Sequence, residues 1–512
     1  MFQQSSTNNA YLWYDLRKEV WRLYTKYERT YTNVPFLLQT LRLERINTVY
    51  VADLKIASYF LLEHMMVTKI KASRGNYYSF RGNDMRWISV DHIFRRPFWI
   101  LAEELDLGEP CGKAVKKLVN IINDISGLKL GREFLTIGQM AWKLLEGFEA
   151  TNGALDQKYY SNDKMYKWFK ERNIYRGGLC LLNKRYAGKT MNNIYKYDKN
   201  SFFSYIMKYG KMPLGRYKIC AGKPTVGFED RLIHCKWTAK AHFDGLAPYE
   251  DKEFFLEEDL WIYGCELQEL MNWYDTLSIE YIEYMVFERS EPDKQFGRFI
   301  DYYYPQKKTA KGAHRQLIKL ILNNIYGKFG QCPYKTYIKQ VGNQIVENNP
   351  KTFLDFEQAK THSLAVAAKI TALARTKLMR DIREATNNRP DIYYIYGDTD
   401  SMILTIPFEG AGDELGQFKF EGRFNKGKVL GKKCYMLYDG SYECHACGVN
   451  RDVLEQEMKD KTWQEADARF NYGEVFMCPT FVDGKIGLRP RALSRGFEKT
   501  TLNTLYDVYE GE

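Results

Sequence analysis

The spacing of apolar and polar residues divides the chain into strand-like and helix-like segments. Short β-prone runs predict strands at 48–51, at 193–198 and across 391–404, where the sequence is DIYYIYGDTDSMIL. Apolar residues that recur every three to four positions predict helices around 113–125, 136–148, 311–327 and 357–385. The part before about residue 170 is therefore expected to mix α and β, and helices laid against antiparallel strands predict an α+β core after it.

Length and charge narrow the class of protein. A chain of 512 residues, 45% of them hydrophobic, should form about two to four structural units. Its formal net charge of +11 favours a polyanionic partner such as nucleic acid, and its 39 tyrosines suit base stacking as well as they suit a tyrosine-rich core. The apolar stretch from Tyr50 to Met66 is interrupted by Asp53, Lys55 and Glu63, so we expect no membrane span.

Ten cysteines are scattered through the chain and no secretory leader precedes them, which predicts reduced thiols in a cytoplasm, that of a host if the protein is viral. Cys444 and Cys447 form a C-x-x-C, with Cys434 and His445 nearby. A structural zinc site usually has a second ligand pair at regular spacing, so we do not expect one here.

Two aspartate-bearing segments are candidates for chemistry. Gly397-Asp398-Thr399-Asp400 lies between β-prone flanks, a composition that predicts a tight hairpin with carboxylates at its tip. Alone, such a tip is more often a solvated turn, and the ligand spacing of an EF-hand calcium loop is absent. Asp198, however, ends another predicted strand. Opposed carboxylates from two strands can hold two divalent ions about 4 Å apart, and Mg²⁺ prefers such oxygen ligands.

Basic residues between these segments could bind phosphate. They recur at intervals of four, at Lys307, Lys311, Arg315, Lys319 and Asn323. On a helix the later members would form a polar stripe, while Leu317, Ile318, Leu320, Ile321 and Leu322 face inward. The alternative is an ordinary solvated helix face.

Two shorter elements follow the same stripe along the chain. Tyr326 could pack on a base pair beside Gly327, and Lys433 and Tyr435 share one face of a predicted strand, offering a charge for phosphate and a ring for a sugar or base. Neither is specific alone, but all these elements occur once each in a fixed order.

In that order they resemble the family B DNA polymerases, whose motifs are D-x-x-S-L-Y-P, K-x-x-x-N-S-x-Y-G and Y-x-D-T-D-S. The matching segments are Asp198–Ser204, Lys319–Gly327 and Tyr396–Ser401. Tyr175-Arg176-Gly177-Gly178 matches the Y-x-G-G element that joins exonuclease and polymerase domains, and YRGGLCLLNKRY resembles the protein-primed branch of small phages and linear plasmids. The resemblance is strong from Tyr175 onward and weak before it.

The resemblance implies a role for each matching residue. Catalytic roles fall to Asp198, Asp398 and Asp400, among which Asp398 is expected to support the hairpin. Two Mg²⁺ ions, for which Mn²⁺ can substitute, are expected to be held by Asp198, Asp400 and the carbonyl of Lys199. The expected nucleotide-binding residues are Phe203, Lys307, Lys319, Asn323 and Tyr326. The expected DNA-binding residues are Tyr175, Gly177, Gly178, Ser201, Gly327, Thr399, Lys433 and Tyr435.

The implied architecture is a right hand with an antiparallel palm sheet, fingers and thumb, behind an N-terminal mixed α/β domain of exonuclease type. The expected boundaries are a degenerate 3′–5′ exonuclease-like domain at 1–170, palm at 171–259 and 357–430, insertions of the terminal-protein-region type at 260–304 and 332–356, fingers at 305–331 and thumb at 431–512. In relatives the insertions clamp the priming protein and downstream DNA, which gives processivity and strand displacement.

The chain departs from the family at several positions. Phe203 replaces the tyrosine that excludes the ribose 2′-hydroxyl, Ser204 replaces a proline, and Asn324 replaces a serine. A ring of similar shape should still block a ribonucleotide.

The exonuclease motifs depart further. Their nearest matches, Asp53–Ala57 and Asn120–Asp124, carry Ala57 and Asn120 at catalytic positions, and no D-x-E occurs in the first fifty residues. One remaining carboxylate, Asp124, cannot hold two metals. We therefore expect no proofreading, unless Asp15 or Glu19 replaces a missing ligand.

These observations predict a monomeric, DNA-directed DNA polymerase that uses template and primer DNA, dNTPs and a terminal priming protein. A silent DNA-binding replication scaffold is the rival from another class, and a different priming mode or an RNA template stays open. The intact aspartates and Lys319 argue against the scaffold.

Overall fold

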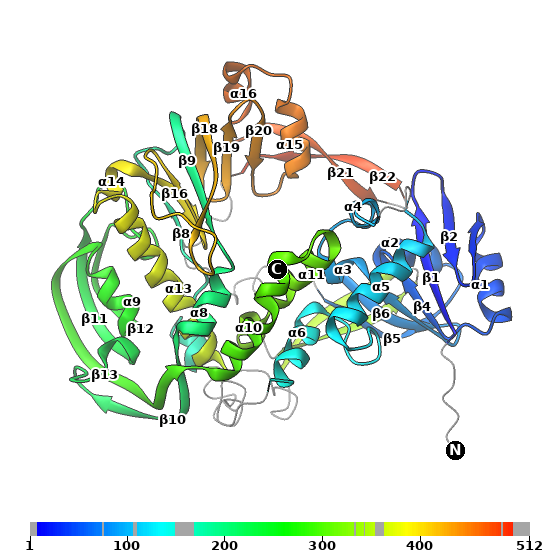
Figure 1. Ribbon diagram of the computed structural model, residues 1–512, viewed down its shortest axis with the longest axis horizontal. Coiled ribbons are helices and arrows are strands. Elements are labelled where there is room, and N and C mark those ends of the chain that lie inside the picture. Colours follow the sequence, from blue (N-terminus) through cyan, green and yellow to red (C-terminus); the bar gives the residue numbers. More distant parts are fainter. Residues whose placement is uncertain are drawn as a thin grey trace.

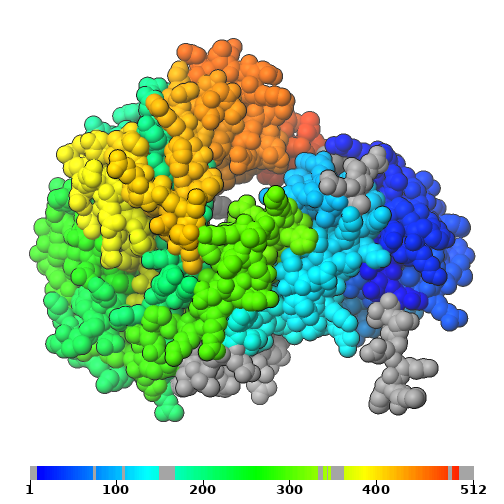
Figure 2. All heavy atoms as spheres, viewed as in Figure 1, coloured from blue at the N-terminus to red at the C-terminus, as the bar shows by residue number. Residues whose placement is uncertain are grey.

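The computed structural model describes residues 8–73, 76–105, 110–148, 168–331, 334–342, 344–353, 363–482 and 485–494. Its parts are arranged around an opening that Figure 2 shows near the middle of the molecule. In the described part of the chain, none of the helices combines the length and apolar character that a bilayer span requires.

Seven strands begin the chain and form one N-terminal sheet (Figure 1). They are β1 (Asn9–Asp15), β2 (Val20–Tyr24), β3 (Glu28–Tyr31), β4 (Thr48–Val51), β5 (Val67–Ser73), β6 (Asn76–Gly82) and β7 (Met85–Ser89). Their order is β3-β2-β1-β4-β7-β6-β5, and only the β1–β4 and β4–β7 pairs are parallel. The predicted strand at 48–51 is confirmed.

The helices of this part are α1 (Val34–Leu43), α2 (Leu54–Leu61), α3 (Asp91–Phe94), α4 (Phe98–Glu103), α5 (Gly112–Ser126) and α6 (Ile137–Glu146). Thr136 and Gln139 form a capping box that starts α6, and Gly127, at φ 64°, ends α5. The two helices predicted here are confirmed, and the N-terminal part mixes α and β as expected.

A second seven-stranded sheet, the central sheet, is antiparallel throughout. Its strands are β8 (Cys180–Leu182), β9 (Thr190–Lys199), β16 (Tyr394–Asp398), β17 (Ser401–Leu404), β18 (Phe418–Gly431), β19 (Cys434–Tyr438) and β20 (Tyr442–His445), in the order β20-β19-β18-β9-β17-β16-β8. The helices α8 (Phe202–Tyr209) and α13 (Leu364–Ala385) pack together beside it. The strand predicted to start at residue 391 instead starts at Tyr394, because Pro390 begins a short helix, α14 (Pro390–Tyr393).

A lateral sheet carries the chain between α8 and the next helices. It contains β10 (Lys211–Ala221), β11 (Leu232–Ala241), β12 (Phe254–Tyr263) and β13 (Tyr274–Pro292) in the order β10-β13-β11-β12, with α9 (Gly264–Leu270) between β12 and β13. The expected boundary of the first insertion, at residue 260, falls inside β12.

Three helices follow: α10 (Lys294–Thr309), α11 (Gly312–Asn323) and α12 (Ile325–Phe329). The prediction that the later members form a polar stripe is confirmed on α11, where Arg315, Lys319 and Asn323 are exposed and the apolar residues between them are buried. Lys307 lies on α10 and Lys319 on α11, because Lys311 is extended and Gly312 takes a φ of 51°. The two helices pack against each other, which brings Lys307 to the stripe on α11.

Two hairpins reach the N-terminal part. The first, β14 (Tyr334–Val341) and β15 (Gln344–Phe353), packs on β5, and the Gln340 side-chain oxygen accepts from the Val67 amide at 2.8 Å. The ends of the second expected insertion, Cys332 and Phe356, lie outside the described residues. The second hairpin, β21 (Val475–Val482) and β22 (Lys485–Ala492), follows α15 (Arg451–Met458) and α16 (Trp463–Arg469). Its Phe481 ring meets the Tyr59 ring of α2, with centroids 5.7 Å apart.

Candidate active site

The end of β9 and the β16–β17 hairpin bring two aspartates together. Asp198 pairs with Ser401 on one side and with Lys419 on the other, so it lies between β17 and β18. The amide of Lys199 donates to the carbonyl of Asp400 at 2.8 Å, which fixes the backbone of the hairpin against β9.

The hairpin itself is tightly determined. Thr399 takes a φ of 63°, and its amide donates to the carbonyl of Leu179 at 2.6 Å. A Cβ on Gly178 would lie 2.7 Å from the Thr399 hydroxyl oxygen, so glycine is needed where this segment passes the tip. The predicted DNA-binding residues Gly178 and Thr399 therefore touch, and they support the aspartates.

Burial raises the pKa of both aspartates. The pKa of Asp198 is raised to about 6 by burial and then by the neighbouring Glu421, against the lowering effect of Lys319, Lys196 and Lys307. The pKa of Asp400 is raised to about 7 by burial, then by Asp198 and Asp398. Two carboxylates that resist ionisation side by side in a buried setting favour a cation between them.

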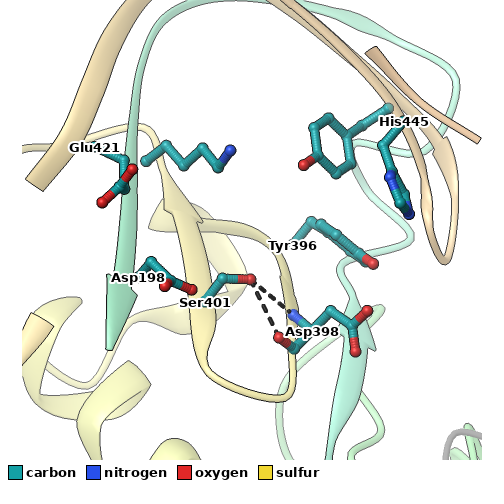
Figure 3. A pocket seen from close by; sticks show the side chains of 8 residues that line it. Asp198, Tyr396, Asp398, Ser401, Glu421 and His445 are labelled. Carbon is teal, nitrogen blue, oxygen red and sulfur yellow. Dashed lines mark hydrogen bonds between the residues drawn. The ribbon is translucent and has the colours of Figure 1, made fainter. Parts of the chain in front are cut away.

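Asp398 faces elsewhere. Figure 3 shows its carboxylate pointing away from Asp198, while the Ser401 hydroxyl bonds its backbone. One carboxylate oxygen accepts from Lys433 Nζ at 2.5 Å and the other from the Thr399 hydroxyl at 2.9 Å. These contacts fit the supporting role expected for Asp398 better than a shared metal-binding role.

The oxygen donors suit a hard divalent cation. Asp198, Asp400 and the Lys199 carbonyl could bind it, and Glu421 lies beside Asp198. Within the described ranges no group of three or more His, Cys, Asp or Glu side chains is arranged to hold an ion. A site of two carboxylates, completed by backbone and substrate oxygens, is the kind that Mg²⁺ occupies.

The basic residues converge on this point from both helices. Lys307 Nζ donates to the Ser201 hydroxyl at 2.6 Å, and its pKa is lowered to about 8 by burial and then by Lys319 and Arg315. Lys319 in turn lowers the pKa of both Asp198 and Asp400. A cationic cluster thus lies next to the paired aspartates.

The ring of Phe203, on α8, stacks on that of Tyr326, on α12, with centroids 4.1 Å apart. Asn323 is exposed, and nothing lies within 4 Å of a Cβ placed on Gly327, so the surface beside this stack is open. Tyr175, by contrast, is only 1% exposed and packs behind the site against Gly330, so its side chain does not reach a surface.

A cavity of about 310 Å³ lies over the central sheet (Figure 3). It is lined by Lys196, Asp198, Tyr396, Asp398, Ser401, Glu421, Tyr435 and His445. Tyr435 stacks on His445 at 5.7 Å between centroids, and Lys433 donates its amide to the Tyr396 hydroxyl at 2.8 Å.

Sequence reasoning missed three lining residues, Lys196, Glu421 and His445. Lys196 precedes Asp198 by two positions on a strand and could have been found by alternation. Glu421 and His445 lie on other strands, β18 and β20, and the sequence does not show that these strands share a sheet with β9.

The family described as DNA polymerase type B, organellar and viral, matches residues 115–393, which are more than half of the chain. The chain belongs to this family. The DNA polymerase of Bacillus phage phi29 is 31% identical over 297 residues, which are 52% of this chain and 48% of that protein. The DNA-directed DNA polymerase of Enterobacteria phage PRD1 is 28% identical over 332 residues, 60% of this chain and 57% of that one. The chain thus spans about half the length of the phage relatives it matches.

Among solved structures, phi29 DNA polymerase complexed with primer-template DNA superposes with a TM-score of 0.73 over 95% of this chain and 99% of that one, at 18% identity. The family B fold expected from the sequence is confirmed.

Among the described residues of the N-terminal part, those that matched the exonuclease motifs do not gather into a group of three or more acidic side chains. Asp53 caps α2, Ala57 is fully buried, and Asp124 is exposed on α5. Asp15 accepts from the amides of Arg17 and Lys18 in a turn. Asp91, which the sequence motifs did not indicate, lies near Asp53. The pKa of Asp91 is raised by burial and then by Asp53.

Proposed function

We propose that the chain is a DNA-directed DNA polymerase that joins the 3′-hydroxyl of a primer to the α-phosphate of a dNTP, with release of pyrophosphate. The observation that carries this proposal is the adjacency of Asp198 and Asp400, both with raised pKa values, beside Lys307 and Lys319. Such an arrangement concentrates cation affinity and triphosphate affinity in one place.

Each group has a distinct task in this proposal. Asp198, Asp400 and the Lys199 carbonyl would hold two divalent ions, which lower the pKa of the attacking hydroxyl and neutralise charge on the phosphates. Lys307 and Lys319 bind the triphosphate, Phe203 and Tyr326 hold the sugar and base, and the Asp398–Lys433 pair orients the strand that carries Tyr435 at the primer end.

The lines of support beyond the site are the family and the fold. Relatives named DNA polymerase match the chain, and phi29 polymerase has been solved with primer-template DNA and incoming nucleotide substrates. On the same grounds we propose template and primer DNA as partners and a protein as primer.

The N-terminal part is proposed to be a wall of the DNA channel without proofreading activity. Contacts from the two hairpins, at Val67 and at Tyr59, and the packing of α5 and α6 on α11 join it to the rest of the molecule. Figure 2 shows the opening that these parts surround. A channel closed in this way would support long, strand-displacing synthesis. Extension of a labelled primer in the presence of a heparin trap measures this directly.

Primer extension with Mg²⁺ tests the main proposal. Asp198→Asn and Asp400→Asn should each abolish dNTP incorporation while DNA binding in a mobility-shift assay persists, since basic side chains supply that affinity. Asp460→Asn, at an exposed position outside the site, is the control. If the wild type binds primer-template but incorporates nothing under any priming condition, the chain is the silent scaffold instead.

A further inference from the structure

Lys199 is a buried lysine that directly follows Asp198. Its Nζ lies 2.6 Å from Oδ2 of Asp381, and the two side chains are only 2% and 7% exposed. Because side chains alternate along a strand, Asp198 faces the cavity while Lys199 points to the opposite face of β9, towards α13.

The Lys199 ammonium joins three separate segments. It reaches Asp381 on α13, donates to the Gly416 carbonyl at 3.2 Å, and lies 4.0 Å from the centroid of the Phe418 ring at the start of β18. Asp381 is also paired with Lys377, one turn earlier on α13. The ion pair is therefore the point where β9, α13 and the segment before β18 are fastened together.

Stability alone does not account for such a pair. Removing two charges from water costs about as much as their attraction returns, and apolar replacements of buried ion pairs are often neutral or stabilising. The buried Lys199 is therefore expected to serve another purpose, which is to hold the neighbouring backbone in position.

The backbone of the same residue connects both candidate metal-binding aspartates. The Lys199 amide bonds the Asp400 carbonyl at 2.8 Å, and the next residue, Asn200, exchanges backbone bonds with Gln417 and Gly416 at 2.9 and 2.8 Å. The ion pair holds the Lys199 side chain on the α13 side of β9. It therefore also holds the backbone at Lys199 and Asn200, which positions Asp198 next to Asp400.

We propose that the Lys199–Asp381 ion pair is a positioning device that sets the spacing of Asp198 and Asp400 and thereby the affinity of the site for divalent cations. The inference rests on the proposed function of these two aspartates as ligands. Neither Lys199 Nζ nor Asp381 touches substrate; both act through the backbone of β9.

The test separates positioning from stability. Lys199→Met/Asp381→Leu removes both charges together, and Lys377, whose side chain is 32% exposed, can turn to solvent. Its melting temperature without metal should stay near that of the wild type. Mn²⁺ binding at pH 8, followed by electron paramagnetic resonance, should weaken about tenfold, the usual effect of losing a partner that orients a ligand. The Mg²⁺ concentration for half-maximal primer extension should rise in parallel.

The control is a second lysine–aspartate pair at the central sheet, in which Lys428 is 5% and Asp467 36% exposed. Lys428 lies 3.1 Å from Asp467 at the far end of β9, beside Thr190. Lys428→Met/Asp467→Leu should leave Mn²⁺ binding unchanged. If the Lys199/Asp381 double variant does not fold, Asp381→Asn replaces it, measured below its own melting temperature with the same expected loss.

Wild-type Mn²⁺ affinity in the double variant, or in Asp381→Asn where that replaces it, overturns the inference. A different result would contradict the proposed function itself: Mn²⁺ binding would then also stay intact in Asp198→Asn and in Asp400→Asn, each made in the otherwise wild-type chain.

Discussion

Phe203 and Tyr326 lie face to face, with ring centroids 4.1 Å apart and planes inclined by 15°. Phe203 comes from α8, directly after the turn that follows Asp198, whereas Tyr326 comes from α12. We propose that the sugar of a nucleotide bound at the paired aspartates would contact Phe203.

Removing that ring should relax sugar selection. Phe203→Ala is expected to lower the ratio of kcat/KM for dNTP to that for rNTP by about 10- to 100-fold, because the steric barrier to a 2′-hydroxyl disappears. Tyr209→Ala, at an exposed position on the same helix, should leave the ratio unchanged. An unaltered ratio in the Phe203 variant would mean that the ring serves only packing.

The two lysines that converge on the site should govern nucleotide affinity. Lys307→Met and Lys319→Met are each expected to raise KM for dNTP by about 10- to 100-fold, the range for loss of a charge-assisted bond to phosphate. The neighbouring Lys308 pairs with Glu414 instead, so Lys308→Met is the control. Steady-state kinetics on one primer-template distinguish the three variants, and equal KM values in all would contradict the assignment.

Divalent-ion binding should depend on pH around neutrality. Asp198 and Asp400, with pKa values of about 6 and about 7, must lose their protons before they can bind a cation. The half-saturating Mg²⁺ concentration is therefore expected to rise as pH falls from 8 to 6. The rise is up to about tenfold per pH unit for each proton that the bound ion displaces. A Mg²⁺ requirement that does not change across this range would show that other groups bind the ions.

The same shift predicts that a catalytic variant is more stable than the wild type without metal. The folded pKa of Asp400 is raised from 3.8 to about 7, so between these values the folded state holds more protons than the unfolded state, and stability falls as pH rises. Above pH 7 the full penalty, on the order of 2–4 kcal/mol, is present. Asp400→Asn should remove it, raising the melting temperature in EDTA at pH 8 but not near pH 4. Equal melting temperatures at pH 8 would contradict this account.

Proofreading is expected to be absent. Incubation with a mismatched, end-labelled primer, Mg²⁺ or Mn²⁺ and no nucleotides should leave the primer intact, because Ala57 offers no ligand and Asp124 lies exposed on α5. Stepwise 3′ shortening that Asp124→Ala abolishes would overturn this, and shortening abolished by Asp53→Ala or Asp91→Ala would assign the activity to these two neighbouring aspartates.

Local pattern predicted the regular elements well. The strand at Thr48–Val51 and the helices α5 and α6 follow from residue spacing and caps alone. The stripe of Arg315, Lys319 and Asn323 on α11 followed from spacing as well. The place of Lys307 on a separate helix did not, because a repeat of four looks the same on one helix as on two helices that pack together, and Gly312 decides between them through its backbone.

Contacts between strands that are far apart in the sequence could not be predicted either. Glu421 faces Asp198 only because β18 pairs with β9 in a register that its own residues do not specify. Lys199 was expected to contribute only a carbonyl, and its ion pair with Asp381 depends on how α13 lies behind the sheet.

The meeting of Tyr59 and Phe481 has a consequence for how a template is loaded. The geometry of a single aromatic pair contributes about 0.5–1.5 kcal/mol beyond the area that the rings bury. We expect a joint that rests on this contact to open and reclose, which would let a covalently closed circle enter sideways without a free end to thread. Once a duplex filled the proposed channel, each brief opening would have to coincide with dissociation along its whole length, so a weak joint would suffice to keep the enzyme on its template.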